Sequence, residues 1–534
     1  MEVEILFKEK AQQALFQGIN ELADAVSSTL GPKGHLVIID KGYGIPHVTK
    51  DGVTVARAYD TNDPMKRMGA TLVKTVAAKT CDEAGDGTTT ATILTHSLIK
   101  NGMSVLPNIG NPQEFKKGIE AARDYSVNYI KGLAKQIGEA DFERVKQIAT
   151  ISANGDEEIG CIISEAIGKV GNDGVITVEE SSKGNETTVE VTTGFQWEKG
   201  LVNPYFVTDP ERMECVLDKP YILVFGQNIN YPQEILPIVQ TVYSAKRSLL
   251  IVAPNASNDV IKFLVTNVQQ NNGLKACFVK APGYGQIQKD MLEDLSVKVG
   301  AKVVGDEFGR GVDQLGTDWL GACDRVVVST NRTILVGGAG SEEDINTRVE
   351  SIKHLMEDNT NAYDVEKFRE RISKLTGGAA VIYVGADSEV ELKEKKDRVD
   401  DAIAATRAAL EEGYVPGGGT IQLRIVEYLR FLPKDSLSSD FKAGMNVVAD
   451  SLLAPFYKLC ENSGVNPIKM EVKLAGGEDW LGYNPISEKI EDMYKAGIID
   501  PAKVTRVSLE NAISVAIQFL NTSCAISMNE ESKK

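Results

Sequence analysis

Apolar residues recur every three or four positions over residues 8–30 and 64–134, for example in VKTVAAKT and TATILTHSLI. This period predicts helices, and the Asn111-Pro112 pair is typical of a helix start. Between the two stretches, HLVIID and HVTKDGVTVA are short runs bounded by glycines, and they predict short strands. The first part of the chain is therefore expected to be mainly helical, with a small β element.

The pattern changes near residue 175, where VITVEE and TTVEVTTG alternate with period two. Helical segments then separate three apolar runs, YILVFG (221–226), SLLIVAP (248–254) and ACFVKAP (276–282). This order predicts βαβ units and a mainly parallel sheet in a separate α/β domain. Helices return beyond about residue 345, interrupted by the strand AAVIYVG. We therefore expect the two helical ends to fold together, with the middle inserted between them.

Length and charge narrow the functional classes. The chain has 534 residues, and because single cores stop growing at roughly 250 to 300 residues, two or three domains are expected. The net charge of −17, without any Lys/Arg-rich run, argues against nucleic-acid and membrane binding. No stretch reaches the roughly 20 apolar residues that span a bilayer.

The cysteines are scattered without a C-x-x-C pair, and the four histidines show no ligand spacing. Buried thiols in a reducing compartment are expected, and a zinc site is not. The first residues, MEVEILFKEKAQQALFQGINELADAV, carry acids at once and a helical period, unlike a secretory signal or a transit peptide. The expected location is cytoplasmic, unless such a segment was removed.

One glycine-rich segment suggests phosphate binding, although no P-loop or dinucleotide motif is present. In AGDGTTTAT, Gly85 and Gly87 permit a tight turn, and the three threonines from Thr88 on sit at a helix N-terminus, where free N–H groups favour an anion. Asp86 would repel phosphate unless a divalent cation such as Mg²⁺ lay between them. The alternative is that Asp86 and Thr88 merely cap the helix.

Three further glycine turns offer N–H donors. They are TLGPKG at 29–34, TKDGVTV at 49–55, which contains Lys50 and Asp51, and PGGGT at 416–420. Each is a common turn and carries little information alone.

Together with these turns, the chain contains in order TLGPKG, KDGVTVA, GDGTTTAT, TISANGDE, GVITVEE, KAPGYG, VDDAIAATRAALEEG and GIIDPAKVTR. With these segments it closely resembles the group I chaperonins, the GroEL type. The match is collinear from about residue 8 to 525, and its specificity is high because so many motifs keep both order and spacing.

The resemblance implies a multidomain α and α/β fold with three domains. A mainly helical equatorial ATP-binding domain would comprise residues 1–134 and 412–534, a small α+β intermediate hinge domain residues 135–192 and 380–411, and an α/β apical domain residues 193–379. The implied function is an ATP-dependent chaperone that folds non-native client proteins in a homo-oligomeric, heptameric single or double ring. A co-chaperonin lid is the other partner that the resemblance suggests.

The resemblance also implies ATP and Mg²⁺ as cofactors and allows K⁺. The positions that match nucleotide contacts are Thr29, Leu30, Gly31, Pro32, Lys50, Asp86, Gly87, Thr88, Thr89, Thr90, Gly418, Asn484 and Asp500. Asp86 matches the Mg²⁺ ligand. Asp401 matches the carboxylate that positions the attacking water, with Asp51 beside it, since hydrolysis needs positioning and charge neutralisation more than a strong base. By itself, Asp401 would be interpreted as a solvated acid on a charged helix.

Two helical segments of the middle part carry apolar stripes. The ordinary interpretation is that both pack on the sheet, and it is kept for Leu264 and Val268. The resemblance implies that other residues face the cavity and bind clients: Leu201, Tyr205, Phe206, Leu236, Val239, Ile261 and Val265.

Several positions depart from the family pattern. Pro485 and Ile486 stand where two alanines are usual, and Pro485 removes an N–H near the nucleotide base. Thr266 replaces an apolar residue that would face clients and a lid. Tyr457 and Asn466 stand where an Arg–Glu contact between rings is expected, and the C-terminus lacks Gly-Gly-Met repeats. These changes predict a weaker lid interaction and a single or less stable double ring.

Two other functions remain open from the residues alone. A Mg²⁺-dependent enzyme acting on a small phosphorylated metabolite would be a monomer or dimer. An ATP-binding scaffold would show no turnover.

Overall fold

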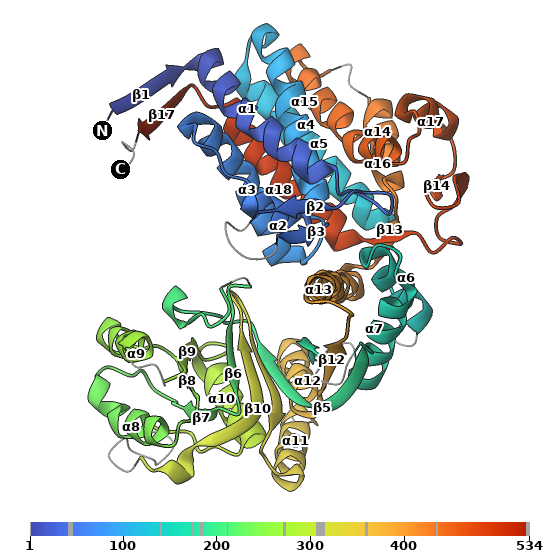
Figure 1. Ribbon diagram of the computed structural model, residues 1–534. Coiled ribbons are helices and arrows are strands. Elements are labelled where there is room, and N and C mark those ends of the chain that lie inside the picture. The colour runs from blue at the N-terminus through green and yellow to red at the C-terminus, as the bar shows by residue number, and fades with distance from the viewer. Residues whose placement is uncertain are drawn as a thin grey trace. The chain divides into compact units, whose positions relative to one another are not determined.

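The computed structural model (Figure 1) describes the chain in ten stretches: residues 2–40, 46–138, 141–171, 175–181, 185–210, 212–270, 274–305, 315–357, 361–433 and 436–529. Two compact units emerge from it. Unit 1 comprises Met1–Glu165, Glu180–Thr188 and Val384–Lys534, and unit 2 comprises Ala166–Glu179 and Val189–Tyr383. The prediction that the two chain ends fold together is therefore confirmed, whereas the three-domain division stays a prediction.

Unit 1 is built mainly of helices, most of which contribute an apolar face to one main core. Its core side chains come from both ends of the chain and include Leu94, Ile99, Phe456 and Phe519. The helices are α1 (Lys8–Ser27), α2 (Gly52–Ala58), α3 (Pro64–Ala84), α4 (Thr88–Val105), α5 (Pro112–Leu133), α6 (Phe142–Ser152), the first part of α7 (Glu157–Val170), α13 (Glu389–Glu412), α14 (Thr420–Phe431), α15 (Ser439–Ser451), α16 (Ala454–Asn462), α17 (Pro467–Leu474) and α18 (Ala502–Leu520). Of these, α6 and α13 pack in smaller clusters beside the main core. The helix start predicted at Asn111-Pro112 is confirmed, since the Asn111 side chain caps α5.

In the described part of unit 1, four two-stranded antiparallel sheets accompany the helices. They pair β1 (Glu2–Phe7) with β17 (Cys524–Asn529), β2 (Val37–Ile39) with β3 (His47–Thr49), β13 (Tyr414–Pro416) with β16 (Ile499–Pro501), and β14 (Leu481–Asn484) with β15 (Lys489–Asp492). The sequence predicted β2 and β3 only. The other pairs join segments too short, or too distant in sequence, to show in a local pattern.

The prediction of a strand through HVTKDGVTVA is wrong beyond Thr49, because the segment turns into helix α2. Asp51 causes the change. Its carboxylate accepts hydrogen bonds from the Val53 and Thr54 amides at 3.0 and 2.9 Å and from the Thr54 hydroxyl at 2.6 Å. A side-chain cap of this kind satisfies the free N–H groups of a first helical turn, so it outweighs the β propensity of the valines.

Helices α1 and α3 pack with their backbones almost in contact. A Cβ atom on Gly69 would lie 1.9 Å from the Leu15 carbonyl oxygen. We expect Gly69→Ala to push the helices apart and to lower the free energy of unfolding of unit 1 by about 1–3 kcal/mol in denaturant titrations. Gly132→Ala, on α5 with nothing within 4 Å, is the control and should raise it by up to about 1 kcal/mol. Equal effects of the two changes would contradict this account of the packing.

Unit 2 contains most of a nine-stranded sheet. Its strand order is β4-β12-β5-β11-β10-β7-β8-β9, with β6 also paired to β10. The strands are β4 (Val175–Glu180), β5 (Thr188–Trp197), β6 (Cys215–Asp218), β7 (Tyr221–Val224), β8 (Leu249–Ala253), β9 (Ala276–Lys280), β10 (Gly321–Val328), β11 (Thr333–Gly338) and β12 (Gly378–Val384).

The predicted βαβ units are confirmed, because β7, β8 and β9 are parallel neighbours. The prediction of a mainly parallel sheet is wrong, because β10 pairs antiparallel with β6, β7 and β11, and β11 pairs antiparallel with β5. The alternation of apolar and polar residues identified individual strands here, but it does not show whether neighbouring strands run parallel or antiparallel. The overall class, multidomain α and α/β, is confirmed.

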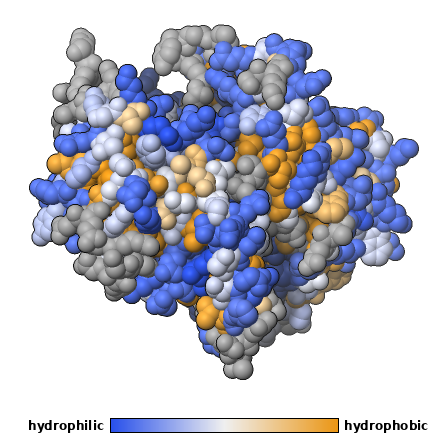
Figure 2. All heavy atoms as spheres, turned by 90° about the horizontal axis from the view of Figure 1, so that it is seen from below, coloured by the Kyte–Doolittle hydropathy of each residue, from blue (hydrophilic) through white to orange (hydrophobic). Residues whose placement is uncertain are grey.

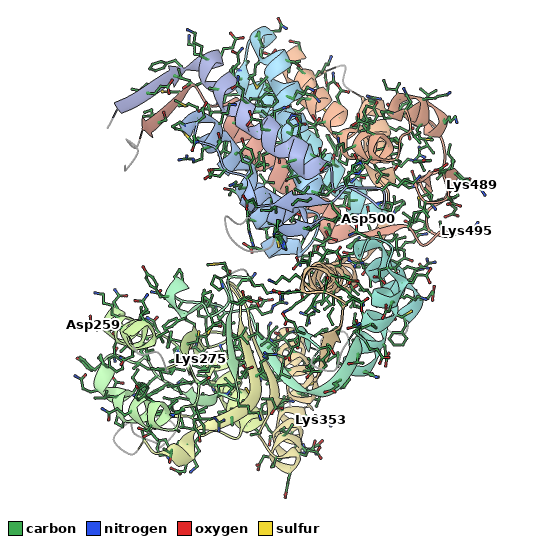
Figure 3. The ribbon with its side chains drawn as sticks, viewed as in Figure 1. Asp259, Lys275, Lys353, Lys489, Lys495 and Asp500 are labelled. Carbon is green, nitrogen blue, oxygen red and sulfur yellow. The ribbon has the colours of Figure 1, made fainter. Side chains whose placement is uncertain are left out.

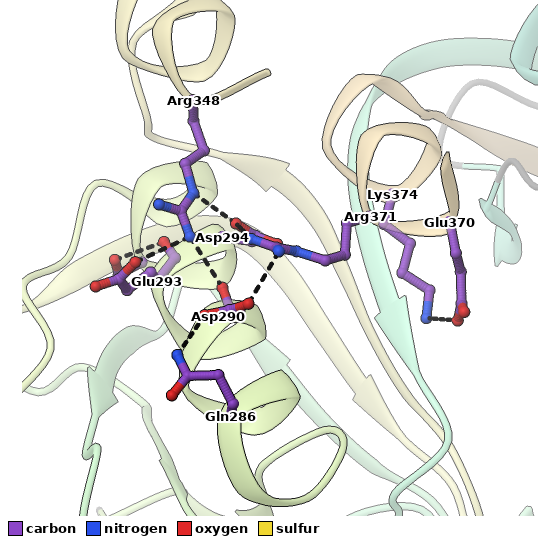
Figure 4. A network of polar contacts seen from close by, with 9 residues as sticks. Gln286, Asp290, Glu293, Asp294, Arg348, Glu370, Arg371 and Lys374 are labelled. Atoms are coloured by element: carbon purple, nitrogen blue, oxygen red, sulfur yellow. Dashed lines mark hydrogen bonds and ion pairs between the residues drawn. The ribbon is translucent and has the colours of Figure 1, made fainter. Parts of the chain in front are cut away.

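The helices of unit 2 are α8 (Leu236–Ser244), α9 (Asn258–Gln270), α10 (Gly285–Val299), α11 (Glu342–Glu357) and α12 (Ala362–Thr376). A buried charge cluster joins three of them (Figure 4). Arg371 on α12 donates to both carboxylate oxygens of Asp294 on α10, at 2.7 and 3.1 Å, and Arg348 on α11 donates to the same carboxylate at 2.7 Å. Asp294 is 1% and Arg371 6% exposed, so these ions are paired inside the protein. Among the described helices, none is long and apolar enough to cross a membrane.

Candidate functional site

A single pocket of unit 1 gathers every residue predicted to bind nucleotide or to catalyse its hydrolysis. Its lining includes Thr29, Leu30, Gly31, Pro32, Lys50, Asp51, Asp86, Gly87, Thr88, Thr89, Thr90, Asp401, Gly418, Asn484 and Asp500. These residues come from segments spread over more than 470 positions of the chain. The structure thus brings the set together, while the role of each residue stays a prediction.

The GDGTTT segment forms the turn that its glycines predicted. Gly85 and Gly87 adopt left-handed φ values of 73° and 83°, and α4 begins at Thr88. The alternative interpretation, in which Asp86 and Thr88 merely cap the helix, is wrong: the N-cap residue is Gly87, without a side-chain cap. The first turn of α4 therefore presents backbone N–H groups and the positive end of the helix dipole to the pocket.

Asp86 is held in place beside this turn. Its carboxylate accepts hydrogen bonds from the Gly87 amide and, at 2.8 Å, from the hydroxyl of Ser152 at the end of α6. Ser152 was missed by the sequence reasoning, because a serine in the segment TISANGDE carries no sign of this contact. Burial raises the pKa of Asp86, the two hydrogen bonds oppose the rise, and the charge of Asp51 adds to it.

Asp401 on α13 faces the same group of acids. Burial raises the pKa of Asp401 well above its usual range, and the charges of Asp51 and Asp86 raise it further. Arg398, one helical turn earlier, donates to Asp156 at 3.0 Å and pairs with Glu394 at 2.8 Å. These contacts anchor α13 to the segment after α6, so Arg398 is a positioning residue for Asp401.

The donor set fits a magnesium ion that is bound together with phosphate. Among the described residues, no three His, Cys, Asp or Glu side chains gather closely enough to form a metal site alone. Mg²⁺ typically takes one or two carboxylates and completes its shell with phosphate oxygens and water. Asp86 can supply such a carboxylate, and a cation there would relieve the repulsion among the pocket acids.

Asp500 on β16 lies within unit 1, whereas Lys489 and Lys495 lie at its outer edge in Figure 3. The Lys495 side chain is 86% exposed and pairs with Asp492, so its charge does not offset the negative charges of the pocket acids. Burial, followed by the charge of Asp86, raises the pKa of Asp500 to about 7.

This raised pKa predicts how stability depends on pH. In the unfolded chain the carboxyl group has its ordinary pKa of about 3.9. Between that value and about 7 the folded protein binds more protons, so the contribution of Asp500 makes it less stable as the pH rises through this window. We expect Asp500→Asn to raise the melting temperature without nucleotide by a few degrees at pH 8 and by much less at pH 5. An equal rise at both pH values would refute this assignment.

Asn484 lines the pocket, but its amide group is already bonded. Its Nδ2 atom donates to Glu491 at 2.6 Å, and its Oδ1 atom accepts from the Ile486 amide at 2.8 Å. Pro485 follows it without an N–H. These contacts are therefore made within the β14–β15 turn, and the effect of Pro485 and Ile486 on the nucleotide base stays a prediction.

The apolar residues expected to bind clients lie in unit 2, in two different environments. Tyr205 is 62% and Leu236 36% exposed, and Leu201, Ile261 and Val265 are half-buried. The prediction of exposure is wrong for the other two, Val239 and Phe206, which are 4% and 1% exposed. The short helix α8 buries Ile238, Val239 and Val242 together in the core, which leaves Val239 unavailable at the surface.

The surface of the protein carries both hydrophobic and hydrophilic side chains. On the face drawn in Figure 2, hydrophobic patches are separated by hydrophilic residues.

Leu264 is buried and Val268 packs against the core of unit 2, so the interpretation that these two residues pack on the sheet is confirmed.

The remaining departures have local explanations. The Tyr457 hydroxyl donates to Glu471, and Asn466 caps α17 by accepting from the Lys469 amide at 2.9 Å. Both side chains therefore make contacts within their own chain. Thr266 is exposed on α9. The C-terminal segment forms β17 up to Asn529, and residues 530–534 lie outside the described part of the chain.

Known proteins were compared with this fold and site. The model of the TCP-1/cpn60 chaperonin family matches residues 22–530. Among solved structures, the chaperonin gp146 from the bacteriophage EL 2 (Pseudomonas aeruginosa), crystallised in the presence of ATP-BeFx, is similar in two crystal forms. Crystal form II has a TM-score of 0.73 at 23% identity, and crystal form I 0.65 at 24%. Each alignment covers 98% of this chain and 99% of the other. As its motifs implied, this chain belongs to the TCP-1/cpn60 chaperonin family.

Proposed function

We propose that this chaperonin binds and hydrolyses ATP in the pocket of unit 1 and uses the cycle to fold non-native proteins. One observation carries the proposal: a helix N-terminus, several glycine turns and a group of acids from distant segments line one pocket. The family match supports a chaperone function, and an ATP analogue was present with the similar phage chaperonin. An enzyme for a small phosphorylated metabolite has no comparable support.

Each part of the pocket suits one task. The first turn of α4 and the turn at Gly31 would hold phosphate oxygens through backbone N–H groups. Asp86 would hold Mg²⁺, which neutralises phosphate charge when bound. Asp401 would accept a hydrogen bond from the attacking water and orient it in line, while Asp51, whose oxygens already cap α2, would shape the charge around it.

Client binding would use the exposed apolar residues of unit 2. Tyr205 and Leu236 would contact clients first, with the half-buried Leu201, Ile261 and Val265 beside them. Apolar contact of this kind recognises chains whose own core is not yet buried, without reading their sequence.

Assembly into a ring of seven copies would cover apolar strand residues of unit 1. Ile38 on β2 is 70% exposed, and Ile5 on β1 and Ile526 on β17 are 47% and 56% exposed. Isolated two-stranded sheets are marginally stable and their free edges tend to pair with another strand. We propose a neighbouring subunit as that partner, and a lid that binds weakly if at all, given the exposed Thr266. The cytoplasmic location stays a prediction.

Phosphate release and electron microscopy of the purified protein test this function together. We expect release from ATP that requires Mg²⁺ and falls at least tenfold in Asp86→Ala, with sevenfold rings in the images. Replacing K⁺ by Na⁺ in the same assay tests whether phosphate release also depends on K⁺. Monomers or dimers that release no phosphate from Mg-ATP would overturn the proposal.

A further inference from the structure

Apolar groups make up another part of the pocket lining. Leu459, Pro485, Ile486 and Ile498 all contribute to it. A Cβ atom on Gly418 would lie 3.7 Å from the Ile498 side chain, which places this glycine in the same area. Walls of this kind suit the flat, weakly polar base and the sugar of a nucleotide better than its phosphates.

This area offers few polar groups to a ligand. The amide of Asn484 is bonded at both ends, Pro485 has no N–H, and the Ile486 amide donates to Asn484. The β14–β15 turn therefore does not supply a free side-chain amide for a nucleoside.

Gln422 differs from these groups. It lies on α14, two residues after the helix begins, and it lines the pocket while only 4% of its surface is exposed. Its Oε1 atom has no hydrogen-bond partner in the described part of the chain. Several other described side chains have a buried polar atom without a partner, but none of them lines this pocket. An unpaired buried acceptor destabilises a protein, so its presence in a ligand pocket calls for a donor on the ligand.

Helix α14 holds Gln422 in a fixed place. Two residues on, the buried Arg424 donates to the carbonyl oxygens of Leu474 and Leu481 at 3.0 and 2.9 Å and to Glu427 at 2.9 Å. These contacts fix the helix against the β14 region, so the backbone of Gln422 is held beside the pocket before a ligand arrives.

We propose that Gln422 Oε1 accepts a hydrogen bond from the nucleoside half of the bound nucleotide. The donor is a ribose hydroxyl or the exocyclic amino group of adenine, both of which ATP carries. This inference rests on the proposed function and deepens it, because it makes Gln422, rather than Asn484, the side chain that contacts the nucleoside.

The test uses Gln422→Met, which keeps the length of the side chain and removes the acceptor. Calorimetric titration with ATP should show binding about three- to tenfold weaker than that of the wild type, the value of one ordinary hydrogen bond. Without nucleotide, the melting temperature should rise, because an unpaired buried acceptor is gone. A purely structural glutamine would give the opposite pattern, with a lower melting temperature and unchanged affinity, and that result would overturn the proposal.

The matched control is Gln196→Met. Gln196 lies on β5 in unit 2, and its Oε1 atom is also buried without a partner among the described residues. This variant should leave ATP affinity unchanged. Equal losses of affinity in both variants would show an indirect effect and would contradict a contact at Gln422.

Nucleotide analogues identify the donor. For the wild type, we expect one of 2′-deoxyATP, 3′-deoxyATP and inosine triphosphate to bind about three- to tenfold more weakly than ATP, and Gln422→Met to abolish that difference. If every difference persists in the variant, the proposal fails although nucleotide binding stands. If the wild type binds no nucleotide at all, the proposed function itself fails.

Discussion

Asp401→Ala should lower the rate of phosphate release from Mg-ATP by about 100- to 10,000-fold, the range typical of a lost group that orients or deprotonates a nucleophile. Binding of ATP should remain within about threefold of the wild type. The physical reason is that the pocket already holds the charges of Asp51 and Asp86 beside Asp401, so losing one carboxylate lowers repulsion toward an anionic ligand. Steady-state phosphate release and calorimetric titration measure the two effects separately.

The control for this change is Asp400→Ala. Asp400 precedes Asp401 on α13 but does not line the pocket. Its replacement should leave both phosphate release and binding nearly unchanged. Turnover by Asp401→Ala within threefold of the wild type would refute the assignment and would favour an ATP-binding scaffold in which this acid has no part.

The second large effect is expected in unit 2, where Asp294→Ala removes the carboxylate shared by Arg348 and Arg371. Arg371 then keeps Asp290 at 3.0 Å and Arg348 keeps Glu293 at 2.9 Å, but the fully buried carboxylate that joins them is gone. Breaking a buried ion pair by removing one partner typically costs about 3–5 kcal/mol. Of the three tryptophans, Trp197 and Trp319 lie in the core of unit 2, and Trp480 lies in unit 1. In a Trp480→Phe background, fluorescence during urea titration therefore reports on unit 2.

A surface ion pair supplies the control. Glu350 and Lys353, on α11, pair at 2.8 Å, with side chains 63% and 48% exposed. Glu350→Ala should change the free energy of unfolding by less than about 1 kcal/mol, because exposed pairs contribute little. If Asp294→Ala were as mild as this control, the charge cluster would not be what stabilises the packing of α10, α11 and α12.

Local patterns predicted the elements whose stability is itself local. The apolar period of α1, α3, α4 and α5, the Asn111 cap and the runs that become β7, β8 and β9 all appear in the sequence. Pairings between distant segments did not. The β1–β17 pair joins the two ends of the chain, and the direction of β10 and β11 depends on neighbours that no short window contains.

In the candidate site, too, local patterns predicted some features and missed others. The Gly85 and Gly87 turn and the start of α4 at Thr88 follow from conformational rules for glycine and helix ends. The assembly of distant segments around it followed only from the resemblance to a family. Ser152, Arg398 and Gln422 were missed, because each has a meaning in the pocket only through a contact, or a missing contact, in three dimensions.

Exposure was the least predictable property. The apolar stripe on α8 suggested exposure for Val239 as much as for Leu236, yet Val239 is buried and Leu236 reaches the surface. A helix of nine residues that buries three neighbouring side chains has a wider covered face than a simple stripe suggests. The solvent-facing set could therefore be drawn only after the packing was known.

The most direct measurement is the recovery of an aggregation-prone test protein that is diluted from denaturant into this chaperonin. The assay compares samples with and without Mg-ATP, and with and without an added lid protein. Each condition is run with the wild type and with Asp401→Ala. We expect high recovery for the wild type with ATP, little without it, and little for Asp401→Ala under any condition. Equal recovery with and without ATP, or full recovery by Asp401→Ala, would contradict the claim that ATP hydrolysis in the unit 1 pocket drives folding.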